Sequence, residues 1–551
     1  MMNKKGLRFG VIFNCNDVEN WQINCVEKML EIKYVDAGLV ITVDNTPSKS
    51  KKDSDARLGE WLTEIPTIEV QGGSDAGQLS KSEKECINVQ RLDFVINFSM
   101  KRIEEEIANL LPYGVWTFQH NSDSEGYRWE IVNEETVTFA GLFQLTQKNE
   151  QIPLKQGCFS IIKDSFKKNK KHITSVISGW PALVCRDILN NNADYLNHLS
   201  KFASIPNRGK STLVPRRKYI GKLFKNKYKL LFSKLFSYEY WNVGIVNKPI
   251  HEFLNDSNAE INWLIEKKDL YYADPFAYKD KDGLRILMEE LDYRVVKGYI
   301  SSVSVTPNCG LNIGTFDQAL MKLPCHMSYP FILEHNNHIY CIPETSEAKE
   351  AAIYKLNKAS KQWEKIKALL KDFPAVDSTI VHYGGYWWLF CTRSFSTVQS
   401  HNNELHIFYA DDLLGEWKSH SLNPVKFDIR SSRPAGTPFI HQGALYRPAQ
   451  DCSKTYGGRI VLNRIKLLTT TQFEEEPICF IEPKSESLYP DGVHTVSSAG
   501  GITIIDGKRF DYSFLHFFRK LYKYKPVKNL QKLPRATSVK KNTKKNFFFV
   551  K

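Results

Sequence analysis

Hydrophobic and polar positions follow two different patterns along the chain. From residue 7 to about 200, short apolar runs such as "LRFGVIFN" and "AGLVITV" alternate with segments of helical spacing such as "NWQINCVEKMLEI". This alternation predicts a small α/β domain with a largely parallel sheet. No glycine-rich phosphate-binding motif follows the first run, so a dinucleotide or P-loop site has little support.

From residue 270 to about 510, five similar units follow one another. Each has an apolar strand, a turn at Asp, Asn or Gly and a returning strand, as in "SYPFILEHNNHIYCIPET". Two such strands around a short turn form a hairpin. Alignment of the units on Phe276, Phe331, Thr379 and Phe439 gives spacings of 55, 48 and 60 residues. Strand repeats of this length indicate a β-propeller, here with five blades.

The length of 551 residues, with 42% hydrophobic and 12% aromatic residues, suits two or three buried cores. We predict a multidomain chain: an α/β domain over residues 1–200, a basic amphipathic linker over 201–240, an all-β five-bladed propeller over 241–510 and a basic aromatic tail over 511–551.

The net charge of +14 comes from two segments. Residues 208–234 hold ten Lys and Arg and no acid, and residues 513–551 hold twelve and no acid, so the rest of the chain carries −8. Both segments mix bases with aromatic residues and leucines, which suits an anionic membrane surface. A solvated linker and tail would have the same composition. Nucleic acid is disfavoured, because no nucleic-acid-binding motif accompanies the charge.

Cysteines and the N-terminus bear on the compartment. The eleven cysteines form no CxxC pair and no metal-like spacing, which indicates reduced thiols and no metal site. The N-terminal apolar run ends by Asn14, and no stretch approaches the roughly 18 apolar residues that a spanning helix needs. We expect a cytoplasmic protein that can lie peripherally on the inner face of the membrane.

Charged residues recur at fixed places in the repeat. Glu289 and Glu344 each lie 13 residues after the aligned phenylalanine, and Asp274 and Asp377 each lie just before the inner strand. The fourth and fifth units add four more polar residues that should face the channel: Arg433, Arg447, Asp451 and His494. Such a cluster is costly to bury unless it is paired, and it often marks function. Carboxylate–arginine pairs that hold blades together are the alternative.

The repeat resembles the five-bladed propeller of furanosidase-type glycosidases. The resemblance implies three catalytic carboxyl groups. An Asp of the first blade would be the base or nucleophile, an Asp in mid-propeller would adjust the pKa of a catalytic group, and a Glu would be the acid. Asp274 matches the first and Asp377 the second. Glu344 is taken as the acid in preference to Glu289.

A more specific resemblance covers about residues 240 to 510. The motifs "ADPF", "SYPF", "IPETSE", "RSSRPAG" and "YRPAQDCS" follow in the order seen in the N-terminal domain of glucosamine inositolphosphorylceramide transferase and its bacterial relatives. The resemblance implies a carbohydrate context, namely construction of a surface polysaccharide or glycolipid. That transferase has a separate glycosyltransferase domain, and this chain shows none.

The N-terminal part resembles the formyltransferase fold. The run "YGVWTFQHNS" stands where that family has a G-x-x-N-x-H-P-S motif. His120 matches the catalytic histidine, but Phe118 replaces the asparagine and Asn149 falls near the aspartate. A phenyl ring cannot stabilise an oxyanion, and an Asn cannot balance an imidazolium. Formyl transfer is therefore disfavoured, and His120 is expected to be a structural residue of a degenerate site.

Three functions stay open at this point. The first is a sugar transferase whose propeller mouth binds the donor, with Asp274 or Glu344 as the base and Arg433 and Arg447 facing a phosphate. Its acceptor would be a glycan or lipid-linked sugar, and no cofactor is evident beyond a nucleotide-sugar donor. The second is a furanosidase-type glycoside hydrolase with paired carboxylates. The third is a noncatalytic glycan-binding scaffold.

Overall fold

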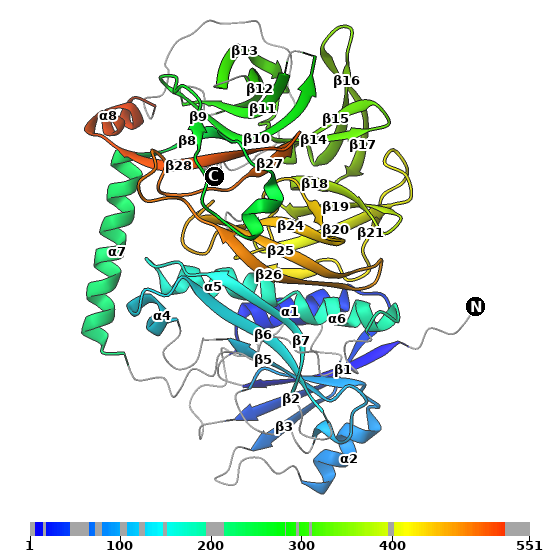
Figure 1. Cartoon of the computed structure of the whole chain (residues 1–551). Helices are drawn as coiled ribbons and strands as arrows, with labels where there is room; N and C mark the ends of the chain where they lie inside the picture. Colours follow the sequence, from blue (N-terminus) through cyan, green and yellow to red (C-terminus); the bar gives the residue numbers. More distant parts are fainter. Residues whose placement is uncertain are drawn as a thin grey trace, which may run out of the picture.

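The computed structural model describes most of the chain in twelve segments. These are residues 6–14, 18–44, 65–71, 80–99, 107–120, 127–146, 151–193, 214–281, 283–293, 297–307, 311–394 and 402–523. Asn149, and residues 208–213 and 524–551 of the two basic segments, lie outside them. The described residues confirm the predicted fold class, since an α/β domain is followed by a β-propeller (Figure 1).

The N-terminal domain is built on a mixed sheet whose strand order is β7-β6-β5-β4-β1-β2-β3. Five strands are parallel: β1 Leu7–Asn14, β2 Val35–Asp44, β3 Thr67–Gln71, β4 Phe94–Asn97 and β5 Val115–His120. Two antiparallel strands extend the sheet: β6 Val137–Leu145 and β7 Gln151–Ser160. The helices are α1 Asn20–Leu30, α2 Lys81–Val89, α4 Arg128–Val132, α5 Phe166–Ile177 and α6 Trp180–Leu189.

Alternation along β1 places one core on each face of this sheet. Phe9, Val11 and Phe13 point toward the core that contains residues of α1, α5 and α6. Ile12 points the other way, into the core that contains Ile87 of α2. A strand with apolar side chains on both faces is covered on both faces, which accounts for the near-continuous apolar run "LRFGVIFN".

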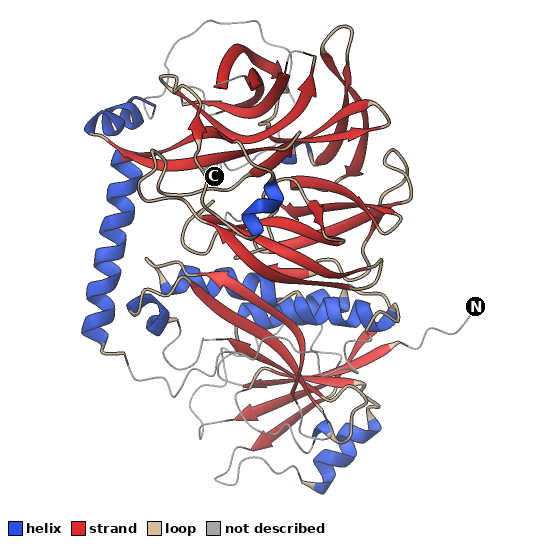
Figure 2. Ribbon diagram, viewed as in Figure 1, coloured by secondary structure: helices blue, strands red, loops and turns tan. Residues whose placement is uncertain are grey.

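The propeller consists of five four-stranded antiparallel units (Figure 2). Blade 1 holds β10 Leu270–Asp280, β11 Gly283–Asp292, β12 Lys297–Pro307 and β13 Leu311–Met321. Blade 2 holds β14 Ser328–His335, β15 His338–Glu344, β16 Glu350–Asn357 and β17 Gln362–Lys371. Blade 3 holds β18 Ala375–Tyr383, β19 Tyr386–Arg393, β20 Glu404–Ala410 and β22 Lys426–Asp428, with β21 Lys418–Ser419 beside β20. Blade 4 holds β23 Phe439–His441, β24 Ala444–Asp451, β25 Arg459–Leu468 and β26 Phe473–Ile481.

Blade 5 closes the ring with strands from both ends of the propeller. It joins β27 Val496–Ala499 and β28 Ile502–Tyr512 to the earlier strands β8 Ser237–Val246 and β9 Asn262–Trp263. The antiparallel pairing of β28 with β8 runs without interruption from Thr503↔Val246 to Tyr512↔Ser237. Blade 5 therefore contains both the first strand of the propeller, β8, and its last strand, β28, and their pairing closes the ring. β8 begins four residues before residue 241, where the sequence pattern placed the boundary.

A shared sheet joins the two domains. β22 of blade 3 pairs in parallel with β7 of the N-terminal domain through Phe427↔Gly157 and Asp428↔Cys158. A Cβ atom at Gly157 would lie 3.0 Å from Cβ and the carbonyl oxygen of Phe427, so the glycine permits this close approach. The Phe427 ring packs on Trp180 of α6 at 5.4 Å. The N-terminal sheet therefore continues into the propeller.

Two further helices lie at the outside of the molecule. α7 Arg216–Phe236 occupies most of the described part of the predicted linker and runs alongside both domains (Figure 1). α8 Phe514–Lys523 packs near its C-terminal end. Among the described helices, none has the length and hydropathy needed to cross a bilayer.

Candidate functional site

The first three blades carry the same irregularity at the start of their inner strands. The register shifts between Ala273 and Phe276, between Ser328 and Phe331, and between Val376 and Thr379. Inside these bulges, three residues have positive φ angles: Asp274 at 51°, Tyr329 at 43° and Asp377 at 53°. Such strain costs of order 1–3 kcal/mol each and persists only where the surroundings fix it. The repeated bulge thus places three equivalent side chains at the start of the inner strands of blades 1, 2 and 3.

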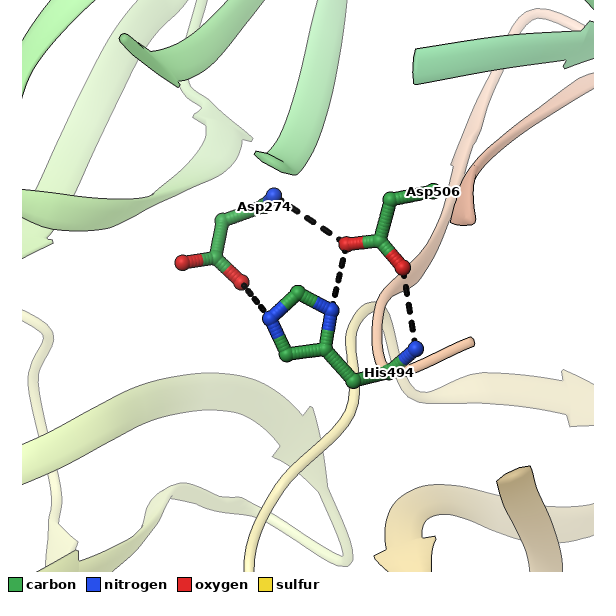
Figure 3. Close-up of side chains that lie close together, drawn as sticks. All are labelled: Asp274, His494 and Asp506. Atoms are coloured by element: carbon green, nitrogen blue, oxygen red, sulfur yellow. Dashed lines mark hydrogen bonds and ion pairs between the residues drawn. The ribbon is translucent and has the colours of Figure 1, made fainter. Parts of the chain in front are cut away.

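Asp274 is buried and accepts hydrogen bonds from two other blades. Its Oδ1 accepts from Thr495 Oγ1 at 2.9 Å, and its Oδ2 accepts from the backbone N–H of Tyr329 at 3.3 Å. His494 Nε2 lies 3.2 Å from the same Oδ1 (Figure 3). The backbone N–H of Asp274 donates to Asp506 Oδ2 at 3.1 Å. The carboxylate of blade 1 is therefore tied to blades 2 and 5.

His494 lies between two carboxylates, as Figure 3 shows. Its Nδ1 is 2.6 Å from Asp506 Oδ2, opposite the Nε2 contact with Asp274. The backbone N–H of His494 also donates to Asp506 Oδ1, at 2.9 Å. The imidazole packs against Trp241 with ring centroids 4.0 Å apart and meets Tyr456 edge-on at 5.3 Å. Each ring nitrogen of His494 therefore faces a carboxylate oxygen.

Asp377 forms a second buried cluster, with Arg433 and Gln450. Arg433 donates from Nε to Oδ2 at 2.5 Å and from Nη2 to Oδ1 at 3.2 Å, and Gln450 Nε2 donates to Oδ2 at 2.8 Å. Asp377 is 1% exposed and Arg433 is 4% exposed. Burial is the largest single influence and would lower the pKa of Arg433, but the charges of Asp377, Tyr456 and Glu344 and the hydrogen bonds to Asp377 together outweigh it and raise that pKa well above its usual value. This is a bidentate buried ion pair.

Tyr329 connects the two clusters, and the sequence analysis did not single it out. Besides its backbone bond to Asp274, its hydroxyl lies 2.9 Å from Thr379 Oγ1 and accepts from the backbone N–H of Gly436 at 2.6 Å. Burial, followed by the charges of Asp377 and Asp274, raises the pKa of Tyr329 well above its usual value. Its place in the alignment, two residues before Phe331, is the signal that would have found it.

The two glutamates of the repeat have different surroundings. Glu344 is buried at the end of β15, accepts from Ser346 Oγ at 3.0 Å, and its charge helps to raise the pKa of Arg433. Glu289 is buried at a matching place in blade 1, where its Oε1 lies 3.2 Å from His326 Nε2. Of the two, Glu344 is the one linked electrostatically to the Asp377 cluster.

Arg447 and Asp451 are engaged within blade 4. Arg447 donates from Nε and Nη2 to the carboxylate of Glu475 at 2.8 and 2.6 Å, and Lys426 Nζ donates to the same carboxylate at 2.8 Å. Burial opposes ionisation of Glu475, yet these cations lower its pKa to about 2. Asp451 accepts from Arg459 Nε at 2.8 Å. We interpret Arg447 and Asp451 as residues that stabilise blade 4 through ion pairs, and we do not include them among the candidate site residues.

Three residues could also hold a metal ion. One ligand atom each of Asp274, His494 and Asp506 lies within 4.8 Å of the others, the only such group found among the described residues. They come from sites up to 232 residues apart in the sequence, so no spacing could reveal them. Both ring nitrogens of His494 already face carboxylates, so a cation would have to displace one of these contacts. The expectation of no metal and no cofactor stays a prediction.

His120 in the N-terminal domain lies among aromatic rings at the end of β5. Its Nδ1 is 3.4 Å from the Tyr127 hydroxyl, and Trp21 meets the ring edge-on at 5.6 Å. Burial, with a smaller effect from Lys170, lowers the pKa of His120 to about 4, so the ring is neutral at pH 7. Phe118 packs edge-on against the same Trp21 at 5.2 Å. Asn149, the third residue of the degenerate motif, lies outside the described residues.

Comparison with known proteins identifies relatives of the propeller. Residues 265–488 match the family described as "Glucosamine inositolphosphorylceramide transferase 1, N-terminal". Glucosamine inositolphosphorylceramide transferase 1 of Oryza sativa subsp. japonica is 33% identical over 250 residues, which cover 43% of this chain and 33% of the relative. The chain thus spans about a third of that relative's length. The resemblance predicted from the sequence motifs is confirmed for this segment.

Solved structures resemble each part. Glycinamide ribonucleotide transformylase 1 from Symbiobacterium toebii is 11% identical and covers 34% of this chain and 90% of its own, with a TM-score of 0.26. A thermostable family-43 glycoside hydrolase is 10% identical and covers 42% of this chain and 85% of its own, with a TM-score of 0.31. We infer no activity from either likeness.

Proposed function

We propose that this protein transfers a sugar in the synthesis of a glycolipid or surface polysaccharide, and that the sugar binds at the propeller mouth. One observation carries the proposal. The segment that matches the transferase family, residues 265–488, contains two buried carboxylates in the bulges of inner strands, Asp274 and Asp377. It also contains Arg433, which is buried against Asp377, and Glu344, which is buried at the end of β15. A dense network of buried charges inside the matching segment favours a functional site.

Sugar transfer needs a base for the acceptor hydroxyl and a cation near the departing phosphate. Asp274, backed by His494, and Glu344 are the candidate bases. Arg433 is the candidate cation, and Tyr456 and Asn402, both half-buried, cover it. The Tyr456 ring centroid is 5.0 Å from the Arg433 guanidinium, and Asn402 Oδ1 accepts from Arg433 Nη1 at 2.9 Å.

The test is a panel of nucleotide sugars offered with inositolphosphorylceramide and other lipid acceptors, with products identified by mass spectrometry. Asp274→Asn removes the charge of the candidate base and keeps its shape. We expect it to lower turnover by about 100-fold or more. Asp411→Asn is the matched control, because Asp411 is exposed in a turn of blade 3 and should leave turnover unchanged. Equal turnover in the two variants would overturn the proposal.

A noncatalytic glycan-binding role is the second candidate, and the pairing of the site favours it. Asp377 is held by Arg433 and Gln450, and Asp274 by Thr495 and His494, so neither carboxylate is displayed to solvent. Tight glycan binding by the intact chain without turnover of any donor would support this second role. Asp377 in an arginine pair also counts against a hydrolase in which two unpaired carboxylates flank the bond.

A further inference from the structure

We infer that α7 and α8 form a docking surface for an anionic lipid bilayer. Among the residues that the structure describes, the contacts of α7 with the rest of the protein come from one side of the helix. Asn226 Nδ2 donates to the carbonyl of Lys163 at 2.8 Å, Lys222 pairs with Glu134, and the Arg128 guanidinium lies 5.5 Å from the Tyr219 ring centroid. These contacts fix the orientation of the helix, so its opposite side has a defined direction.

The opposite side of α7 carries an apolar stripe. At 3.6 residues per turn, spacings of four, four and three residues keep four side chains on one face: Ile220, Phe224, Tyr228 and Leu231. Phe224 is 71% exposed, Tyr228 68% and Leu231 56%. Large apolar side chains on one exposed face of a helix mark a binding surface.

α8 extends this surface. Phe514 and Phe518, one turn apart, are both exposed, and Phe236 at the end of α7 packs on Phe514 with ring centroids 5.4 Å apart. Lys520 Nζ donates to the carbonyls of Lys234 and Ser237, which fastens α8 to the C-terminal end of α7. The two helices are therefore packed together at this end, and each carries exposed aromatic side chains.

Charge decides what this surface can bind. α7 holds eight Lys and Arg and no acid. Exposed lysines flank the apolar stripe on both sides, for example Lys225 and Lys227. Among the described residues, Lys222 is the one base of this helix that pairs with an acid. Aromatic and aliphatic side chains between cations fit the boundary between headgroups and acyl chains of an anionic bilayer.

The test is flotation of the full chain with vesicles of phosphatidylcholine, with and without phosphatidylglycerol. We expect binding only when phosphatidylglycerol is present, and weaker binding at high salt. Phe224→Ser/Leu231→Ser should weaken binding by at least about tenfold, because both apolar side chains would no longer be buried in the bilayer. Lys225→Gln/Lys227→Gln should weaken it by roughly 10- to 30-fold, about fivefold for each charge.

Matched controls lie elsewhere on the surface. Ile265→Ser/Leu488→Ser removes two exposed apolar side chains of the propeller, and Lys358→Gln/Lys361→Gln removes two exposed charges of blade 2. Both should bind like the unaltered protein. Vesicle binding that survives both α7 double substitutions would overturn the inference, and so would tighter binding to a single-stranded oligonucleotide than to phosphatidylglycerol vesicles. No sugar donor is present, so the outcome is independent of sugar transfer.

Discussion

Two histidines, His494 just before β27 of the propeller and His120 at the end of β5 of the N-terminal domain, have opposite surroundings. His494 lies between Asp274 and Asp506, with each ring nitrogen within 3.2 Å of a carboxylate oxygen. His120 lies between Trp21 and Tyr127, and the nearby charge that affects it, Lys170, further lowers a pKa that burial has already lowered.

The difference between the two histidines leads to a contrast that experiments can test. An imidazole between carboxylates belongs to a network that can hold and pass protons, whereas a desolvated imidazole beside a lysine stays neutral. The N-terminal domain instead supports the propeller, because its edge strand β7 extends blade 3 through Phe427↔Gly157. The idea that this domain only supports the propeller is a hypothesis. Three predictions test this contrast.

The largest effect is a loss in the free energy of unfolding, and we expect it when the buried ion pair of Asp377 and Arg433 is broken. Arg433→Met leaves the carboxylate of Asp377 buried without its cation. Removal of one partner from a buried ion pair costs about 3–5 kcal/mol in the free energy of unfolding. Urea denaturation followed by circular dichroism should show this loss in the propeller transition.

Arg464→Met is the control, because Arg464 forms the same kind of pair with Glu476 on an exposed part of blade 4. An exposed pair contributes at most about 1 kcal/mol. The double variant Asp377→Asn/Arg433→Met should regain part of the loss, since it leaves no charge behind. If Arg433→Met were no more harmful than Arg464→Met, the mouth would not depend on its charge pairing.

A smaller loss in the free energy of unfolding is expected in the N-terminal domain when the pH is lowered. His172 of α5 is buried edge-on against Phe159 at 6.0 Å, and burial lowers its pKa to about 4. The native state keeps the ring neutral, while the unfolded chain takes up a proton below about pH 6.5. The free energy of unfolding should therefore fall by about 1–3 kcal/mol as the pH falls from 6.5 to about 4.

His172→Gln should remove this part of the pH dependence, and urea denaturation at several pH values measures it. His338→Gln, at an exposed position of blade 2, is the control and should keep the pH dependence of the unaltered protein. A His172→Gln variant that loses as much stability in acid as the control would show that His172 is not the neutral buried group described here.

The repeat in the sequence was enough to predict the propeller and part of its mouth. The period of roughly 50 residues and the shared place of Asp274 and Asp377 predicted equivalent residues in blades 1 and 3, and the structure gives both the same bulge and a positive φ angle. Tyr329 was missed because only acids and bases were compared, although the bulge selects the position and not the residue type. Asp506 was missed because it lies inside β28, at no repeated place.

Partners and domain contacts could not be predicted in the same way. No spacing or repeat could indicate that Asp274 meets His494, 220 residues later, whereas Asp377 meets Arg433. The pairing of β22 with β7 involves two residues on each strand, and such a short match has no hydrophobic period that could indicate it. The helix α7 was recognisable as a basic amphipathic segment, but its outward face depends on where it docks.

The smallest effect on sugar transfer is expected from a change at His120. This variant compares the N-terminal domain with the propeller most directly. His120→Gln keeps a side chain of similar size and removes only the titrating ring. If the N-terminal domain is a scaffold, this variant should transfer sugar at the rate of the unaltered protein, or bind glycan equally well if no donor turns over, while Asp274→Asn fails. The same assay with both variants in parallel gives the comparison. A loss in His120→Gln as large as that in Asp274→Asn would place the chemistry, or a part of it, at the end of β5, because the aromatic surroundings of His120 would then serve a ligand and not a core.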